Sequence, residues 1–215
     1  MSILEPSPRM IFILLPAYNE EEGIEKLLDR LRRITQTFVK QYKILIVNDG
    51  SADHTLQVIE CFKNELNIEI ISFPKNQGVT KVFQVGLEKI CSEGKDDDVC
   101  ITMDSDNTQN PYVILDILKK MEASADIVIA SRLTKGGKVI GAPVLRRFLS
   151  WAVAFLMGKI ANIKGITDYS TFYRGIRVKI LRQGFEKYGD KLIIGHGFSS
   201  MAGLLVKLSQ FTDRI

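Results

Sequence analysis

Two acidic residues separated by one serine, Asp104 and Asp106, are the side chains whose spacing most directly suggests chemistry. Two carboxylates about 4 Å apart repel each other by roughly 1 kcal/mol in water, and by more in a cleft, so such a pair favours a proton or a cation. Hard divalent ions such as Mg²⁺ and Mn²⁺ prefer oxygen ligands and commonly bind one or two carboxylates together with substrate phosphates. The pair therefore indicates a metal site that bridges to phosphate, and two solvated acids capping the next helix are the alternative.

The elements that must position this pair are short apolar runs alternating with helical patterns over the first 130 residues. Continuous apolar strands linked by helices are typical of a parallel sheet covered on both faces. We therefore expect an α/β, Rossmann-like, mostly parallel sheet. The predicted strands are 10–15, 44–47, 68–73, 99–103 and 127–130, and the predicted helices are 24–34, 55–64, 79–91 and 111–122.

Polar segments follow the five predicted strands where each strand ends. In a parallel sheet these ends meet at one edge, and ligands bind beyond it. The segments are Pro16-Ala17-Tyr18-Asn19-Glu20, Asn48-Asp49-Gly50-Ser51, Pro74-Lys75-Asn76-Gln77-Gly78, Asp104-Ser105-Asp106 and Ser131-Arg132. The sequence therefore predicts the active site at this edge.

Three charged residues at this edge have two interpretations each. Asp49 could accept hydrogen bonds from a base or ribose, or cap a helix. Glu20 could bind a nucleotide or begin the first helix. Arg132 could pair with phosphate or with the aspartate pair, or lie on the surface. No GxGxxG follows the first strand, which argues against a nicotinamide dinucleotide.

The second part of the chain is less regular and more basic. Residues 1–130 carry 14 Lys and Arg against 21 Asp and Glu, whereas residues 131–215 carry 15 against 4, a formal charge of +11. Such an excess suits phosphates or an anionic membrane surface, and a solvated basic face is the alternative. No nucleic-acid-binding motif accompanies the charge, so nucleic acid is not expected as a partner.

Three segments of this part have patterns of their own. Residues 146–160 read as a helix that lies either in a membrane interface or in the protein interior. Residues 168–178 could form a strand, and residues 198–208 look helical. The three cysteines lack CxxC spacing and fit a reducing compartment, and no run of about 18 apolar residues predicts a membrane span.

Taken in order, these segments resemble family-2 glycosyltransferases of the GT-A fold, and among them the dolichol- or polyprenol-phosphate mannosyl and glucosyl synthases. The resemblance covers about residues 10–212 and includes Asn76…Gly78, Met103-Asp104-Ser105-Asp106, Ser131-Arg132 and Asp168…Tyr173-Arg174. It departs from the family pattern where a glutamine is often found two residues after the second aspartate, because here Thr108 stands there and Gln109 follows.

The resemblance implies a role for each matched residue. Asp104 and Asp106 would hold Mg²⁺ or Mn²⁺, with Arg132 and Asp168 as further catalytic candidates. Arg147 and Arg174 would approach donor or acceptor phosphates. The predicted nucleotide-binding residues are Pro16, Ala17, Tyr18, Glu20, Asp49, Asn76, Gly78, Lys81 and Ser105.

The expected activity is metal-dependent, inverting transfer of a mannose- or glucose-type sugar from a GDP- or UDP-linked donor to a polyprenyl phosphate. We expect one domain, 1–215, with a nucleotide-sugar-binding half (1–132) and an acceptor-side half (133–215) that is truncated at its C-terminus. The expected location is cytoplasmic, peripheral at the cytoplasmic face of a membrane. The oligomeric state is left open.

Three alternatives are kept open. If a saccharide hydroxyl is the acceptor, a carboxylate base is needed, and Asp168 is the candidate. The run Ile101–Thr108 also fits a haloacid-dehalogenase-like phosphatase with Asp104 as its nucleophile, although the downstream paired acids of that class are absent. A module that binds a nucleotide sugar without turnover is the third.

Overall fold

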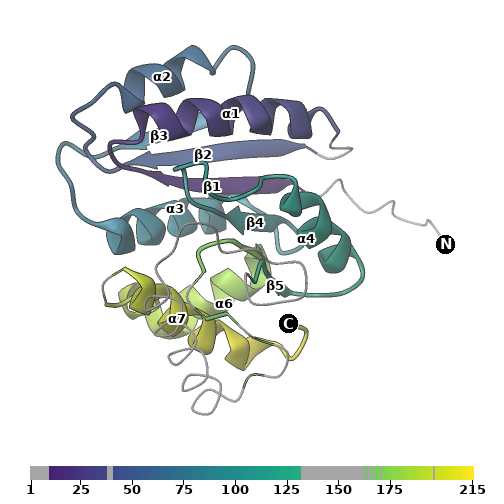
Figure 1. The fold of residues 1–215 in the computed structure, drawn as a ribbon. Helices are drawn as coiled ribbons and strands as arrows, with labels where there is room; N and C mark the ends of the chain where they lie inside the picture. The colour runs from purple at the N-terminus through teal and green to yellow at the C-terminus, as the bar shows by residue number, and fades with distance from the viewer. Residues whose placement is uncertain are drawn as a thin grey trace, which may run out of the picture.

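The computed structural model describes residues 10–37, 41–131, 163, 166, 168–169, 171–195 and 197–215. Within these ranges the chain forms a six-stranded sheet with helices on both faces (Figure 1). This arrangement confirms the predicted α/β class.

The strands closely follow the predicted apolar runs. The first four, β1 to β4, run parallel to one another in the order β3-β2-β1-β4. Pro16 and Ala17, which the sequence analysis placed in the first loop, are the last two residues of β1. They pair with the end of β2. The strands are β1 Ile11–Ala17, β2 Tyr42–Asn48, β3 Ile68–Ser72, β4 Val99–Thr102, β5 Ile127–Ile129 and β6 Arg174–Arg177.

The sixth strand, β6, lies between β4 and β5 and is antiparallel to both. Two antiparallel pairings in succession give β5 the same direction as β4, so the predicted strands all end at one edge. Gly175 of β6 lies directly beneath α4 (Val113–Glu122), because a Cβ atom there would come 2.3 Å from Ile117 Cγ2. The position of β6 was not predicted, since Ile176 pairs with Cys100, far away in the sequence.

The helices also match the predicted patterns, with shifts of a few residues at their ends. The predicted helix 111–122 begins at Val113, so Pro111 precedes it instead of occupying its first turn. The predicted helix over 198–208 is confirmed as α7. The other helices are α1 Glu21–Thr35, α2 Thr55–Cys61, α3 Val79–Glu93 and α6 Val178–Tyr188, and short 3₁₀ turns are found at Gly189–Lys191 and Ser209–Phe211.

The two faces of the sheet bury separate hydrophobic layers because successive strand residues point to opposite faces. Ile11, Ile13 and Leu15 of β1 belong to the layer shared with α1, α2 and α4. Phe12 and Leu14 belong to the layer shared with α3, α6 and α7.

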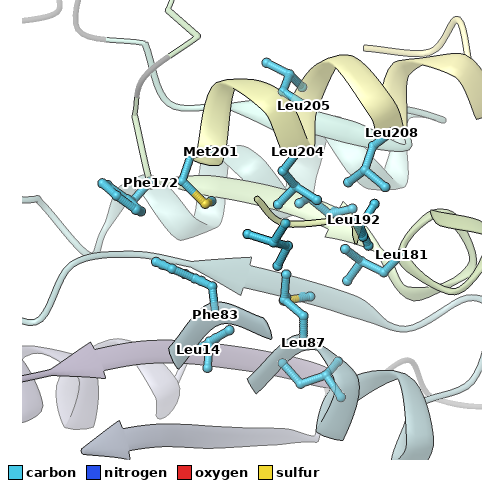
Figure 2. Packing of buried hydrophobic residues seen from close by; sticks show 14 of the residues in the cluster. Leu14, Phe83, Leu87, Phe172, Leu181, Leu192, Met201, Leu204, Leu205 and Leu208 are labelled. Carbon is cyan, nitrogen blue, oxygen red and sulfur yellow. The ribbon is translucent and has the colours of Figure 1, made fainter. Parts of the chain in front are cut away.

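The layer beneath α7 joins the C-terminal part of the chain to the sheet. The rings of Phe83 in α3 and Phe172 stack with their centroids 5.2 Å apart. Figure 2 shows Leu204 and Leu208 of α7 pointing towards Leu192, in the same layer. Helices α6 and α7 are therefore part of a core that they share with the sheet.

Some predictions fall outside the described residues: the helix over 146–160, Arg132 and Arg147. Of the helices that the structure describes, none combines the length and apolarity needed to cross a membrane.

Candidate active site

A pocket of about 320 Å³ opens at the edge where the parallel strands end. Loops after β1, β2, β3 and β4 all contribute to it, as expected for a ligand site of an open α/β sheet. It is lined by Pro16, Ala17, Tyr18, Glu20, Asp49, Asn76, Gly78, Val79, Val82, Asp104, Ser105 and Asp106. All but Val79 and Val82 were predicted as site residues from the sequence.

The loop after β1 is fastened to the loop after β2. Asn19 adopts a left-handed backbone conformation with φ of 53°. Its backbone N–H donates to Ser51 Oγ at 3.0 Å, and its side-chain oxygen accepts from the Ala52 N–H at 2.9 Å. The Glu20 N–H donates to Thr55 Oγ1 at 2.8 Å. These contacts fix the segment that carries Tyr18 and Glu20 into the pocket.

Asp49 holds the loop after β3 in place. Its two carboxylate oxygens accept hydrogen bonds from the backbone N–H groups of Gln77 (2.7 Å) and Gly78 (2.9 Å). Gly50, with φ of 68°, lets the two loops approach, because a Cβ atom there would lie 2.6 Å from Lys75 Cα. Asp49 thus shapes the pocket wall at the start of α3, and each oxygen keeps a second lone pair for a ligand.

The loop after β4 presents Asp104 and Asp106. The side chain of Gln109 makes two hydrogen bonds with Asp104. Its Nε2 donates to Asp104 Oδ2, and its Oε1 accepts from the Asp104 N–H at 3.1 Å. Asp106 Oδ1 accepts from the backbone N–H (2.9 Å) and the hydroxyl (2.7 Å) of Thr108. Gln109, displaced by one place in the sequence, therefore still contacts the first aspartate of the pair, Asp104.

The pocket carries an excess of negative charge. The pKa of Glu20 is raised, mainly by burial and then by the charges of Asp106 and Asp53. A cation beside Asp106 would relieve this repulsion. Among the described residues, no three His, Cys, Asp or Glu side chains are grouped so as to hold a metal ion. A site that uses Asp104 and Asp106 together with substrate oxygens fits this arrangement.

Replacing Glu20 by glutamine is expected to stabilise the metal-free fold more at pH 7 than at pH 4. Because the pKa of Glu20 is raised in the folded state, that state binds the proton more tightly than the unfolded chain does. The wild-type protein therefore loses folding free energy as the pH rises from about 4.5, the unfolded value, through the raised pKa. The glutamine variant lacks this pH-dependent loss of folding free energy, because its side chain at position 20 does not titrate.

The measurement is urea unfolding of both proteins in EDTA at the two pH values. Glu22→Gln, an exposed acid in the same helical turn, serves as the control. A stability difference between Glu20→Gln and wild type that is equal at both pH values, or larger at pH 4, would contradict the expectation.

Three predicted residues that the structure describes, Lys81, Asp168 and Arg174, are not among those that line the pocket. Lys81 Nζ lies 3.5 Å from Gln84 Oε1 on α3. Asp168 is 4% exposed, and its Oδ1 accepts from the Thr171 N–H at 3.2 Å. The catalytic position expected for Asp168 and the nucleotide contact expected for Lys81 are thus without support from the pocket.

Arg174 requires a correction, because its guanidinium is fully buried within the protein. Nη1 donates to the carbonyl of Met201 and Nη2 to the carbonyl of Tyr169, both at 2.7 Å. Burial lowers the pKa of Arg174 to about 10, an effect that the charge of Asp168 partly offsets. Arg174 joins β6 to α7 and does not present its charge to a phosphate in the pocket.

Several residues that line the pocket or hold its loops were not predicted from the sequence. Val79 and Val82 follow Gly78 at helical spacing, so their position on the pocket side of α3 could have been predicted. Arg30 of α1 contacts the loop after β4 through Asn107 and Asn110. No local signal reveals that contact, since the residues are far apart in the chain.

The six-stranded, mostly parallel sheet is the fold of GT-A glycosyltransferases, and comparison with known proteins agrees. The family model described as "Glycosyl transferase family 2" matches residues 12–185. The chain therefore belongs to glycosyl transferase family 2. This membership does not favour the haloacid-dehalogenase-like alternative.

Among curated relatives, the dolichol-phosphate mannosyltransferase of Pyrococcus furiosus is 29% identical over 178 residues, which are 82% of this chain and 48% of that protein. The undecaprenyl-phosphate mannosyltransferase of Micrococcus luteus is 29% identical over 173 residues, 80% of this chain and 68% of that protein. The chain thus spans about half the length of the first relative and about two thirds of the second.

Solved structures share the fold at lower identity. Glucosyl-3-phosphoglycerate synthase from Mycobacterium tuberculosis, in complex with Mn²⁺ and uridine-diphosphate-glucose, superimposes with a TM-score of 0.67 at 17% identity, covering 96% of this chain and 67% of that one. S. aureus TarS 1-349 gives a TM-score of 0.62 at 22% identity, covering 92% and 54%.

Proposed function

We propose that the chain is a glycosyltransferase domain that transfers a sugar of the mannose or glucose type from a GDP- or UDP-linked donor to a polyprenyl phosphate. The observation that carries this proposal is the pocket, where ten residues predicted from four separate strand ends lie together. Residues 1–132 would bind the donor and residues 133–215 the acceptor, within a single domain.

Asp104 and Asp106 are the residues that would hold Mg²⁺ or Mn²⁺. When bound, such an ion stabilises the negative charge on a departing nucleoside diphosphate. Without a cation, the carboxylates of Glu20, Asp49, Asp104 and Asp106 in the pocket lining would repel a diphosphate. The Mn²⁺ complex of a protein with the same fold is consistent with this role.

The remaining pocket residues would bind and orient the nucleotide. Tyr18, 46% exposed at the pocket, offers a ring against which a base can stack. The loops held by Asp49 would enclose the ribose and the diphosphate. Such prior fixing of the loops lowers the entropy cost of bringing the donor into a reactive position.

A polyprenyl phosphate suits this pocket because its oxygen is already ionised near neutral pH and needs no strong base. The oxygen would attack the anomeric carbon from the side opposite the diphosphate. One carbon–oxygen bond forms while the other breaks with its electrons passing to the diphosphate, and the configuration inverts. A saccharide hydroxyl would need a base, and Asp168 is not among the residues that line the pocket.

A lipid acceptor would place the protein at a membrane surface, peripheral on its cytoplasmic face. The relatives named above include two whose names specify polyprenyl-phosphate acceptors. The basic balance of residues 131–215 suits an anionic surface. Nucleic acid is not part of the proposal.

The test uses radiolabelled GDP-mannose and UDP-glucose with phosphatidylcholine vesicles that contain undecaprenyl phosphate, in Mn²⁺ or in EDTA. We expect label to enter the lipid only in Mn²⁺, with at least one of the two donors. Vesicles containing undecaprenol, which lacks the phosphate, are the matched control. Transfer to undecaprenol or to a free saccharide, or nucleotide-sugar binding without transfer, would contradict the proposal.

A further inference from the structure

The loop after β4 has an anchor outside the pocket, on α1. Arg30, near the middle of this helix, donates from Nη1 to Asn107 Oδ1 and from Nη2 to Asn110 Oδ1, both at 2.8 Å. Nη1 also lies 3.4 Å from the carbonyl of Gln109. One guanidinium therefore spans the stretch of loop that directly follows Asp106.

The stretch held by Arg30 includes an unusual backbone conformation. Asn107 adopts φ of 60°, a left-handed conformation that is uncommon for non-glycine residues and that asparagine adopts more readily than most. The side-chain oxygen of Asn107 accepts the hydrogen bond from Arg30. The turn that sets the direction of Asp106 is therefore held by a contact from a distant helix.

A second point of α1 touches the same loop two turns earlier. A Cβ atom on Gly23 would come 2.9 Å from Asp106 Cα, so the helix backbone and the loop are in direct contact there. Residues seven apart lie on one face of a helix, which places Gly23 and Arg30 along the same line. The loop therefore contacts α1 at both ends of its turn.

The same loop is also held by Tyr173, the residue directly before β6. The Tyr173 hydroxyl donates to the carbonyl of Asn110 at 3.0 Å. Asn110 therefore accepts a hydrogen bond from Arg30 through its side chain and another from Tyr173 through its backbone carbonyl. Within the loop itself, Gln109 donates to Asp104 and Thr108 donates to Asp106.

We propose that Arg30 is a positioning residue that fixes the loop after β4 so that Asp104 and Asp106 hold a divalent cation together. The proposal rests on the proposed function, because it takes these two carboxylates as the metal ligands. Residues that orient ligands from behind typically change metal affinity 10- to 100-fold when they are replaced.

The test is titration with Mn²⁺, alone and with inorganic pyrophosphate, followed by electron paramagnetic resonance of the free ion. Arg30→Met keeps the length of the side chain but loses its donors, and it is expected to weaken Mn²⁺ binding 10- to 100-fold. Arg30→Lys is expected to recover part of the affinity. Arg33→Met, an exposed arginine on the same helix, is the matched control and is expected to bind as wild type.

Unfolding curves of the same variants separate positioning from folding. If Arg30→Met does not fold, Asn107→Ala removes one of the same contacts and is expected to weaken binding in the same direction. A folded Arg30→Met or Asn107→Ala protein with wild-type Mn²⁺ affinity overturns the inference. If wild-type binding is absent, or survives Asp104→Asn and Asp106→Asn, the metal assignment of the proposed function itself fails.

Discussion

Asp104→Asn and Asp106→Asn are each expected to lower metal-dependent sugar transfer by about two to three orders of magnitude. Loss of a group that stabilises developing negative charge typically costs about 10²–10³ in rate, and a metal ion supplies several kcal/mol of such stabilisation. Asparagine has nearly the shape of aspartate, so the contacts with Gln109 and Thr108 can largely persist. The loss would therefore reflect the missing charge.

The measurement is the initial rate of transfer over a range of Mn²⁺ concentrations, with urea unfolding of each variant alongside. Asp116→Asn, an exposed carboxylate on α4 that does not line the pocket, is the matched control and is expected to keep the wild-type rate. Full activity of both pocket variants would remove the basis of the metal assignment.

Arg174→Ala is expected to destabilise the protein by about 3–5 kcal/mol, the usual cost of breaking a buried charged network by removing one partner. The carbonyls of Met201 and Tyr169 would lose their donors, and the buried Asp168 would lose a compensating charge. Native domains are stable by about 5–15 kcal/mol in total, so this is a large share.

Urea unfolding measures the loss, and Arg33→Ala, on an exposed side chain, is the control with an expected change below about 0.5 kcal/mol. The structure also predicts that any folded fraction of Arg174→Ala keeps the wild-type KM for the acceptor. A stable variant with a strongly raised KM would instead support the phosphate contact that the sequence suggested.

Periodicity predicted the elements well because each depends on residues close together in the chain. The helical spacing of Ile24, Leu27, Leu28, Leu31 and Ile34 corresponds to the buried face of α1. The rule that ligands bind beyond the ends of parallel strands then brought distant loops to one edge, and the pocket contains most of the predicted residues.

Features that depend on distant contacts could not be predicted in the same way. An arginine is usually exposed, so the burial of Arg174 had no sequence signal. Arg30 looks like an ordinary polar position of an amphipathic helix, and only the folded chain shows its contacts with Asn107 and Asn110. The roles of Arg132 and Arg147 stay predictions.

The place of β6 in the sheet has a consequence for how the chain acquires its fold during synthesis. Among the described strands β5 pairs with β6 alone, so within this part of the chain residues 127–129 gain a hydrogen-bonded strand only once residues 174–177 have left the ribosome. Until then β4 also presents an open, apolar edge, a surface prone to pairing with other chains. A fragment ending near residue 132 would keep that edge permanently, so we expect residues 1–132 to need the later residues for solubility.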